Sequence, residues 1–166
     1  MKIRKATLED FNVIIDLVHS TVQSIYPYYY LPEAVNFFLQ HHNEENIKND
    51  IRENRVSVIM DEAERIAGTG TMEGRYIGRV YVLPEYHGKG YGRAIMEALE
   101  AEIAQSFSTS FLDASLPSYD FYLRMGYQPT EYHKFKVEND RILCYYVMEK
   151  NLEQPYVVPV IIQDNF

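Results

Sequence analysis

A loop with three alternating glycines, residues 88–93, follows the apolar run 80–83 and leads directly into a stretch with helical periodicity. Glycine lets the backbone approach an anion without a Cβ atom in the way, and the first N–H groups of a helix are unpaired and partly positive. Residues 88–96 include Lys89 and Arg93 but no Asp or Glu, although the chain carries a formal net charge of −8. A bound anion would replace the acidic residues that usually occupy a first helical turn. The loop is therefore a candidate phosphate-binding site.

Two common nucleotide-binding motifs do not fit this loop. A Rossmann fingerprint needs G-x-G-x-x-G, and counting from Gly88 places Arg93 where the third glycine should stand. A P-loop needs G-x-x-x-x-G-K-[ST], but Leu83 occupies the position of the first glycine and Gly90 that of the hydroxyl residue. From these residues alone, the alternative to a phosphate-binding site is a turn whose glycines only allow a strand to pack closely against a helix.

The pattern of apolar residues predicts which elements hold this loop in place. Strands are expected at 3–6, 56–60, 65–72, 76–83, 110–114, 127–137 and 141–150, and helices at 8–24, 33–40, 46–53, 91–104 and 118–125. The helix at 91–104 has the clearest pattern, because apolar residues recur every four positions from Tyr91 to Ile103. This order predicts a single-domain α/β (α+β) fold with a mixed central sheet flanked by helices. The parallel strands 76–83 and 110–114 are expected to splay apart and form the binding site.

Composition restricts the class of protein further. The chain has 166 residues, which suits one domain, and its acidic balance (pI ≈ 5.1) argues against binding of nucleic acid through phosphate neutralisation. No apolar run is long enough to span a membrane and no secretory signal is visible, so we expect no membrane partner and a cytoplasmic location. The single Cys144 cannot form an internal disulfide, and the adjacent His41 and His42 side chains diverge, so no metal site is expected.

Two motifs together resemble those of the GCN5-related N-acetyltransferase (GNAT) superfamily. The family signature [QR]-x-x-G-x-[GA], which follows a strand and opens a helix, is similar to His87-Gly88-Lys89-Gly90-Tyr91-Gly92 except at His87. The segment Ser115-Leu116-Pro117-Ser118-Tyr119-Asp120-Phe121-Tyr122-Leu123-Arg124-Met125-Gly126-Tyr127 resembles the family pattern N-x-x-A-x-x-F-Y-x-x-x-G-[FY], with Ser115 and Ser118 replacing Asn and Ala. The resemblance covers residues 1–150, the expected acetyltransferase domain. The tail 151–166 is expected to add a strand or a dimer contact.

The resemblance implies that the glycine loop binds acetyl-CoA, which serves as the acyl donor. In this family the backbone N–H groups of the loop bind the pyrophosphate, and the preceding strand pairs with the pantetheine arm. A backbone N–H of that strand polarises the thioester carbonyl. The corresponding residues here are Val80, Tyr81, Val82, His87, Gly88, Lys89, Gly90, Tyr91, Gly92, Arg93 and Ser115.

Tyr122 matches the family tyrosine that lies near the thioester sulfur. A phenol with a pKa of about 10 can donate a proton to the leaving thiolate, whose own pKa is a unit or two lower. The alternative is an ordinary core tyrosine. Glu73, Asp113 and His133 are candidates for the base that removes the amine proton, and the sequence does not choose among them.

Four tyrosines, Tyr26, Tyr28, Tyr29 and Tyr30, occur where this family builds one wall of the acceptor pocket. Aromatic faces attract ammonium groups, and the acidic balance of the chain favours a cationic acceptor. The alternative is that these tyrosines pack at a corner between helices with their hydroxyls in water. The implied partner is a small-molecule or peptide amine, and the apolar stretch 156–162 makes a homodimer plausible.

Three hypotheses about function follow from these residues. The leading one is an acetyl-CoA-dependent N-acetyltransferase that transfers an acetyl group to a primary amine by direct attack in a ternary complex. Its rival is a non-catalytic CoA-binding or regulatory module of the same fold, which the replacements at His87 and Ser115 leave open, although Tyr122 favours the enzyme. The third is a phosphate-binding protein for ATP or NAD.

Overall fold

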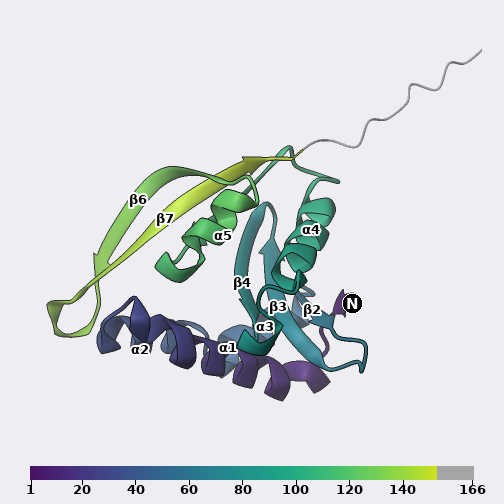
Figure 1. The fold of residues 1–166 in the computed structure, drawn as a ribbon, viewed down its shortest axis with the longest axis horizontal. Helices are drawn as coiled ribbons and strands as arrows, with labels where there is room; N and C mark the ends of the chain where they lie inside the picture. Colours follow the sequence, from purple (N-terminus) through teal and green to yellow (C-terminus); the bar gives the residue numbers. More distant parts are fainter. Residues whose placement is uncertain (153–166) are drawn as a thin grey trace, which may run out of the picture.

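A computed structural model describes residues 1–152 of the chain (Figure 1). The strands are β1 (Lys2–Lys5), β2 (Val56–Met60), β3 (Ile66–Glu73), β4 (Tyr76–Val82), β5 (Thr109–Ala114), β6 (Gln128–Lys136) and β7 (Ile142–Asn151). The α-helices are α1 (Phe11–Ile25), α2 (Pro32–His41), α3 (Glu44–Arg52), α4 (Tyr91–Ile103) and α5 (Tyr119–Arg124). Within this part of the chain, the helices are all too short or too polar to cross a bilayer.

The strands form one mixed sheet in the order β1-β2-β3-β4-β5-β7-β6. Neighbouring strands are antiparallel except β4 and β5, which are parallel. These two strands pair with each other only where Tyr76 lies opposite Phe111 and Ile77 opposite Leu112. Beyond these residues β4 remains paired with β3 and β5 with β7, but β4 and β5 no longer pair with each other. The sheet therefore splays at β4 and β5, which confirms the predicted fold (Figure 1).

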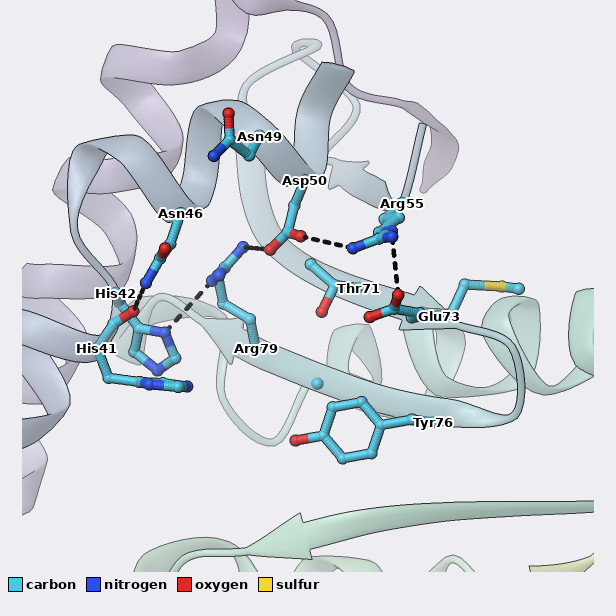
Figure 2. A pocket seen from close by; sticks show the side chains of 12 residues that line it. His41, His42, Asn46, Asn49, Asp50, Arg55, Thr71, Glu73, Tyr76 and Arg79 are labelled. Atoms are coloured by element: carbon cyan, nitrogen blue, oxygen red, sulfur yellow. Dashed lines mark hydrogen bonds and ion pairs between the residues drawn. The ribbon is translucent and has the colours of Figure 1, made fainter. Parts of the chain in front are cut away.

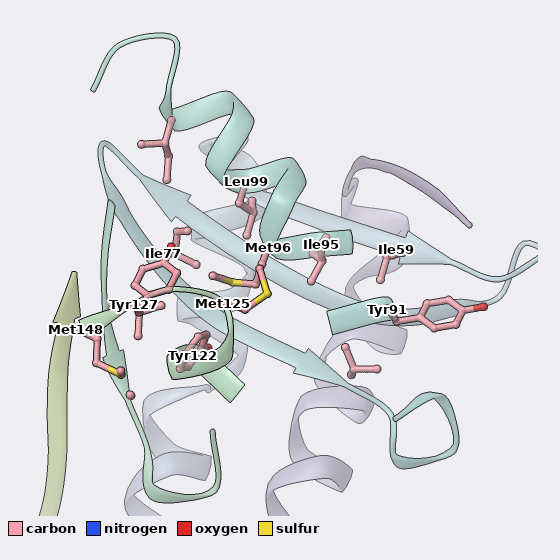
Figure 3. Close-up of a cluster of buried hydrophobic side chains, with 14 of the residues drawn as sticks. Ile59, Ile77, Tyr91, Ile95, Met96, Leu99, Tyr122, Met125, Tyr127 and Met148 are labelled. Carbon is pink, nitrogen blue, oxygen red and sulfur yellow. The ribbon is translucent and has the colours of Figure 1, made fainter. Parts of the chain in front are cut away.

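The sheet carries an apolar core on each face. Because successive side chains of a strand point to opposite faces of the sheet, Val56 and Val58 of β2 belong to one apolar cluster and Ile59 belongs to the other. The first cluster holds the buried stripe of α1, with Ile14 and Val18 fully buried. The second holds the buried stripe of α4, which consists of Tyr91, Ile95, Met96, Leu99 and Ile103 (Figure 3). The two cores thus lie on opposite faces of the sheet next to the splay, and each includes at least one residue of β4.

Glycine lets α4 pack very close to the sheet. A Cβ atom added at Gly70 of β3 would lie 2.8 Å from the Leu99 Cδ1 atom, which is closer than real Cβ contacts. The predicted periodicity of residues 91–104 thus corresponds to a helix that lies against β3 and β4. Its first turn is held at the carboxyl end of β4, because only the turn around Pro84–Tyr86 and the glycine loop separate the two elements.

The long hairpin of β6 and β7 extends the sheet beyond β5 (Figure 1). Gly126, with φ +92°, ends α5 in the left-handed conformation that its sequence position predicts. Leu152 is buried, and its N–H donates to the Ser108 carbonyl at 2.8 Å. The strand or dimer contact expected of the tail lies outside the described residues.

Candidate active site

A cavity of about 940 Å³ lies where β4 and β5 separate. It is lined along β4 by all seven residues of the strand, and by the glycine loop that follows, including Gly88, Gly90 and Gly92. Tyr122 of α5 and Ser115 at the end of β5 also line it. The structure therefore brings the two sequence motifs to one cavity, although the motifs are separated in the chain by α4 and β5.

Strand β4 has a bulge in the middle of this cavity. Thr71 lies opposite Gly78 and Thr69 opposite Tyr81, so Arg79 and Val80 together face the single Gly70 of β3. Arg79 adopts φ +45°, a left-handed conformation that is strained for a residue with a side chain. A bulge of this kind frees backbone groups from the ladder of the neighbouring strand. The freed backbone lies in the stretch that the sequence predicts for polarising a thioester.

The Arg79 side chain anchors the bulge to α3 and to the turn before it. Its Nη1 atom lies 2.7 Å from Asp50 Oδ2, and its Nε donates to His42 Nδ1 at 3.3 Å (Figure 2). Only 7% of the side chain is exposed. Asp50 also pairs with Arg55, which in turn pairs with Glu73. These groups line a smaller pocket of about 360 Å³ that shares Arg79 and Tyr76 with the main cavity.

A chain of buried hydrogen bonds runs from Arg79 to the end of β5. Since the guanidinium can only donate, His42 Nδ1 accepts and His42 Nε2 carries the proton that it donates to the Tyr81 hydroxyl at 3.0 Å. The Tyr81 and Tyr26 hydroxyls lie 3.2 Å apart, and Tyr26 reaches Ser115 Oγ at 3.1 Å. Burial, with the Arg79 charge next in size, lowers the pKa of His42 to about 2. The histidine is therefore neutral, and both phenol rings are fixed beside the bulge.

The glycine loop has the properties of an anion site. Gly88 and Gly90 adopt φ +71° and +86°, which residues with side chains rarely do, and a Cβ at Gly88 would meet no atom within 4 Å. Gly90 is the N-cap of α4, so no side chain caps the helix, and its first turn has no acidic residue. The N–H groups of this turn have no acceptor within the helix. This arrangement suits a phosphate group.

Not every residue predicted for the acyl donor lines the cavity through its side chain. The Tyr91 ring is buried in the core under α4, and Lys89 extends over the Tyr86 ring at 5.8 Å, outside the cavity lining. Arg93 lines the cavity and lies 3.6 Å from Glu97, an exposed pair of little energetic weight. Any contribution of Tyr91 and Lys89 to the loop is thus made by their backbone.

The Tyr122 ring packs in the core while the residue also lines the cavity. The side chain is 6% exposed, and its hydroxyl has no hydrogen-bond partner among residues 1–152. Burial raises the pKa of this phenol above its ordinary value, so it is fully protonated at neutral pH. The phenol therefore lines the cavity as a protonated hydroxyl that has no acceptor among residues 1–152.

The turn that follows α1 points the four clustered tyrosine side chains into different surroundings. Tyr26 and Tyr29 line the cavity. Tyr30 lies outside the lining and instead accepts a hydrogen bond from the Leu116 N–H at 2.8 Å and donates to the Cys144 carbonyl. Tyr28 is 86% exposed and does not reach the cavity. The run of tyrosines thus contributes two residues to the wall rather than four.

The remaining aromatic wall comes from residues that the sequence did not single out. Phe37 of α2 lies 4.9 Å from Phe135 of β6, ring centre to ring centre, so the hairpin closes over α2. The other members of this wall are Phe38, Tyr76 and Tyr145. The alternation of apolar and polar residues along β6 and β7 predicts two strands, but it does not reveal which helix the hairpin contacts.

The three candidate bases differ in position. Glu73 pairs with Arg55 at 2.7 Å and lines only the smaller pocket. The His133 Nε2 atom lies 2.7 Å from Glu131, and the ring stacks on Tyr145 outside the cavity lining. Asp113 lines the cavity itself. Among the three, only Asp113 therefore lines the main cavity.

Comparison with known proteins supplies the family. The family described as acetyltransferase (GNAT) domain matches residues 28–151, which is most of the chain. The chain belongs to the GNAT family. No curated protein sequence matches it.

Solved structures of the GNAT fold are similar over nearly the whole chain. A GCN5-related N-acetyltransferase from Rhodopseudomonas palustris has a TM-score of 0.81 and 20% identity, covering 91% of this chain and 95% of its own. The PaiA N-acetyltransferase from Thermoplasma acidophilum, in complex with coenzyme A, has a TM-score of 0.70 and 18% identity over 90% and 98%. YncA from Salmonella typhimurium, a putative acetyltransferase with acetyl-CoA, has a TM-score of 0.70 and 17% identity over 96% and 98%.

All three residues that depart from the GNAT motifs, His87, Ser115 and Ser118, make side-chain hydrogen bonds in the structure. His87 replaces Gln or Arg at the start of the loop, and its Nε2 atom bonds the Val82 carbonyl at 2.7 Å, which ties the loop to β4. Ser115 replaces Asn, and its hydroxyl bonds Tyr26 and, at 3.0 Å, the Ser118 hydroxyl. These hydrogen bonds connect the loop to β4 and the end of β5 to Tyr26 at the cavity wall.

Proposed function

We propose that this GNAT protein is an acetyl-CoA-dependent N-acetyltransferase that acetylates a primary amine by direct attack in a ternary complex. The neutral amine nitrogen forms a bond to the acetyl carbon and the carbon–sulfur bond breaks. The thiolate takes a proton from an acid of the protein, and the proton that the nitrogen loses restores this acid through solvent. The observation that carries the proposal is the single cavity of about 940 Å³, which joins the glycine loop, the β4 bulge, Tyr122 and the aromatic wall. Donor and acceptor can therefore occupy one space without a covalent enzyme intermediate.

The residues along the cavity fit the chemistry of an acyl-CoA donor. The uncapped first turn of α4 and the left-handed glycines suit the pyrophosphate, because backbone N–H groups there have no other acceptor. The bulge at Arg79 and Val80 supplies backbone outside the β3 ladder for the thioester carbonyl. Tyr122 supplies the proton for the thiolate. Burial raises the pKa of a thiol beside it as well, so the thiolate becomes a stronger proton acceptor in the same surroundings.

A comparison of ligands tests the donor. The purified protein is heated with acetyl-CoA, CoA, ATP or NAD at matched concentrations. A ligand at 100 times its Kd adds about 2.7 kcal/mol to the free energy of unfolding, which raises Tm by about 5–10 °C for a chain of this size. We expect this rise with acetyl-CoA and CoA only. A rise with ATP or NAD alone would overturn the assignment of the glycine loop.

Turnover then separates the enzyme from a binding module. Release of free CoA thiol is measured with a panel of primary amines, and the acetamide is identified by mass. The proposal predicts amine-dependent release. Stabilisation by acetyl-CoA without acetamide formation from any amine would instead support the non-catalytic CoA-binding module.

Substitution of Gly90 with alanine is expected to weaken CoA binding about 10-fold, equivalent to about 1.4 kcal/mol. The left-handed φ of +86° costs a residue with a Cβ about 1–2 kcal/mol, which shifts the N-cap away from the anion geometry. Gly74→Ala is the matched control, since Gly74 has φ +57° in the turn between β3 and β4, away from the cavity. It should lower Tm similarly and leave the CoA affinity unchanged. Equal losses of affinity in both variants would contradict a specific role for Gly90.

A further inference from the structure

One carboxylate faces the acceptor side of the cavity. Among the described residues that line this cavity, Asp113 is the sole acidic one. It lies on β5 directly after the last residue paired with β4, so its position is where the two strands have separated. The Tyr76 hydroxyl donates to Asp113 Oδ2 at 3.3 Å and fixes the carboxylate toward β4.

The other carboxylates near the cavity are already paired. In the adjoining pocket, Asp50 lies 2.7 Å from Arg79 and Glu73 lies 2.7 Å from Arg55 (Figure 2). Asp113 has no arginine or lysine within ion-pair distance among residues 1–152. It is therefore the carboxylate that is free to pair with a cation from outside the protein.

The surroundings of Asp113 are aromatic. Tyr76 and Tyr145 lie near its carboxylate, and the edge-to-face contact of Phe37 with Phe135 closes the wall between α2 and β6. Aromatic faces attract ammonium groups and bury apolar groups. A single negative charge among aromatic rings selects one ammonium group attached to an apolar body. It offers no partner for a second cation, and its own charge repels an anionic substituent next to the ammonium group.

We propose that the acceptor is a monoamine whose one ammonium group binds Asp113 and whose apolar or aromatic body lies against Tyr76, Tyr145, Phe37 and Phe135. This inference rests on the proposed acetyltransferase function and names its substrate class. After binding, one proton moves from the ammonium nitrogen to the Asp113 carboxylate, which leaves the neutral amine that attacks the thioester. The carboxylic acid then returns the proton to solvent.

The electrostatic surroundings of Asp113 suit a proton acceptor. Desolvation raises the pKa of the carboxyl above its usual value. The hydrogen bond from Tyr76 on β4, His133 on β6 and His41 on α2 act in the opposite direction. Tyr145 on β7 is the fourth titratable neighbour, and burial followed by the charge of Asp113 raises its pKa. The net shift of the carboxyl pKa is upward, which makes Asp113 a stronger base than an aspartate with an ordinary pKa.

Three amines test the substrate class. 2-Phenylethylamine has one ammonium and an aromatic body, L-phenylalanine adds a carboxylate to the same body, and spermidine has several ammonium groups and no aromatic body. We expect kcat/KM for 2-phenylethylamine to exceed that for the other two amines at least 10-fold, equivalent to about 1.4 kcal/mol. Higher kcat/KM with L-phenylalanine or spermidine would overturn the inference and leave the acetyltransferase proposal standing. Absence of acetylation of every amine tested would overturn both.

Asp113→Asn tests the residue. Loss of the charge partner and proton acceptor should lower kcat/KM for 2-phenylethylamine about 100-fold, while KM for acetyl-CoA is unchanged. Aniline is the second acceptor, because it is neutral at pH 7 and has neither a charge to pair nor an ammonium proton to lose before attack, so its rate should change less than 3-fold. Asp120→Asn, an exposed aspartate on α5 outside the cavity lining, should leave both rates unchanged. Equal losses with both acceptors in Asp113→Asn would contradict the assigned role.

Discussion

Replacement of Tyr122 with phenylalanine is expected to lower kcat about 100-fold while KM for acetyl-CoA stays unchanged, because general acid catalysis typically contributes ~10²–10⁴-fold. The hydroxyl lies at the cavity in a side chain that is 6% exposed, and burial keeps its pKa above the ordinary value. It therefore keeps its proton until the thiolate forms beside it. Without that proton, the leaving group must depart as a bare thiolate in a site that stabilises charge poorly. Initial rates at saturating acetyl-CoA and amine measure this effect.

The same variant should retain the stability of the protein. Within residues 1–152 the Tyr122 hydroxyl has no hydrogen-bond partner, so its removal leaves no group unpaired. Tyr127→Phe is the matched control, because Tyr127 is fully buried outside the cavity and its hydroxyl lies 2.7 Å from Ser110 Oγ. That variant should cost about 1–2 kcal/mol of stability and leave kcat unchanged. An unchanged kcat in Tyr122→Phe would exclude the phenol as the acid.

Acidification is expected to destabilise the protein below about pH 6.5, with His42 as the largest single cause. Burial lowers the pKa of His42 to about 2 in the folded protein, while the unfolded chain has an ordinary imidazole. Between these two values the unfolded state binds one more proton, so stability falls as the pH falls, by up to ~1.4 kcal/mol per pH unit. From pH 6 to pH 4.5 the loss is about 2 kcal/mol. Urea unfolding at several pH values measures it.

The variant His42→Gln identifies the source of this acid sensitivity. It should be less stable at pH 7, because hydrogen bonds to Arg79 and Tyr81 are lost, but its stability should decline less between pH 6 and 4.5. Burial also lowers the pKa of His41, which contributes a smaller loss of the same sign in both proteins. His133→Gln, at an accessible position on β6, should keep the full decline. An undiminished decline in His42→Gln would contradict a buried neutral His42.

Sequence alone was sufficient for the parts of this protein whose signals are local. The strand, glycine loop and helix around residues 76–104 form a continuous segment, and left-handed glycines and four-residue periodicity are properties of neighbours in the chain. The Tyr122 segment is local for the same reason. These two segments were enough to predict the GNAT family and the splayed mixed sheet, both of which the comparisons and the structure confirm.

Contacts between distant segments were decided only by the folded chain. In the turn after α1, the Tyr26 ring lines the cavity and the Tyr28 ring lies in solvent. Nothing in the run of tyrosines itself distinguishes these two residues. The hydrogen-bonded chain joins His42, Tyr81 and Ser115 from three separate elements, and no spacing rule relates their positions. Packing of the hairpin against α2 likewise decides which side chains surround Asp113. Periodicity shows which face of an element is buried, whereas the partner of that face depends on the packing of the whole chain.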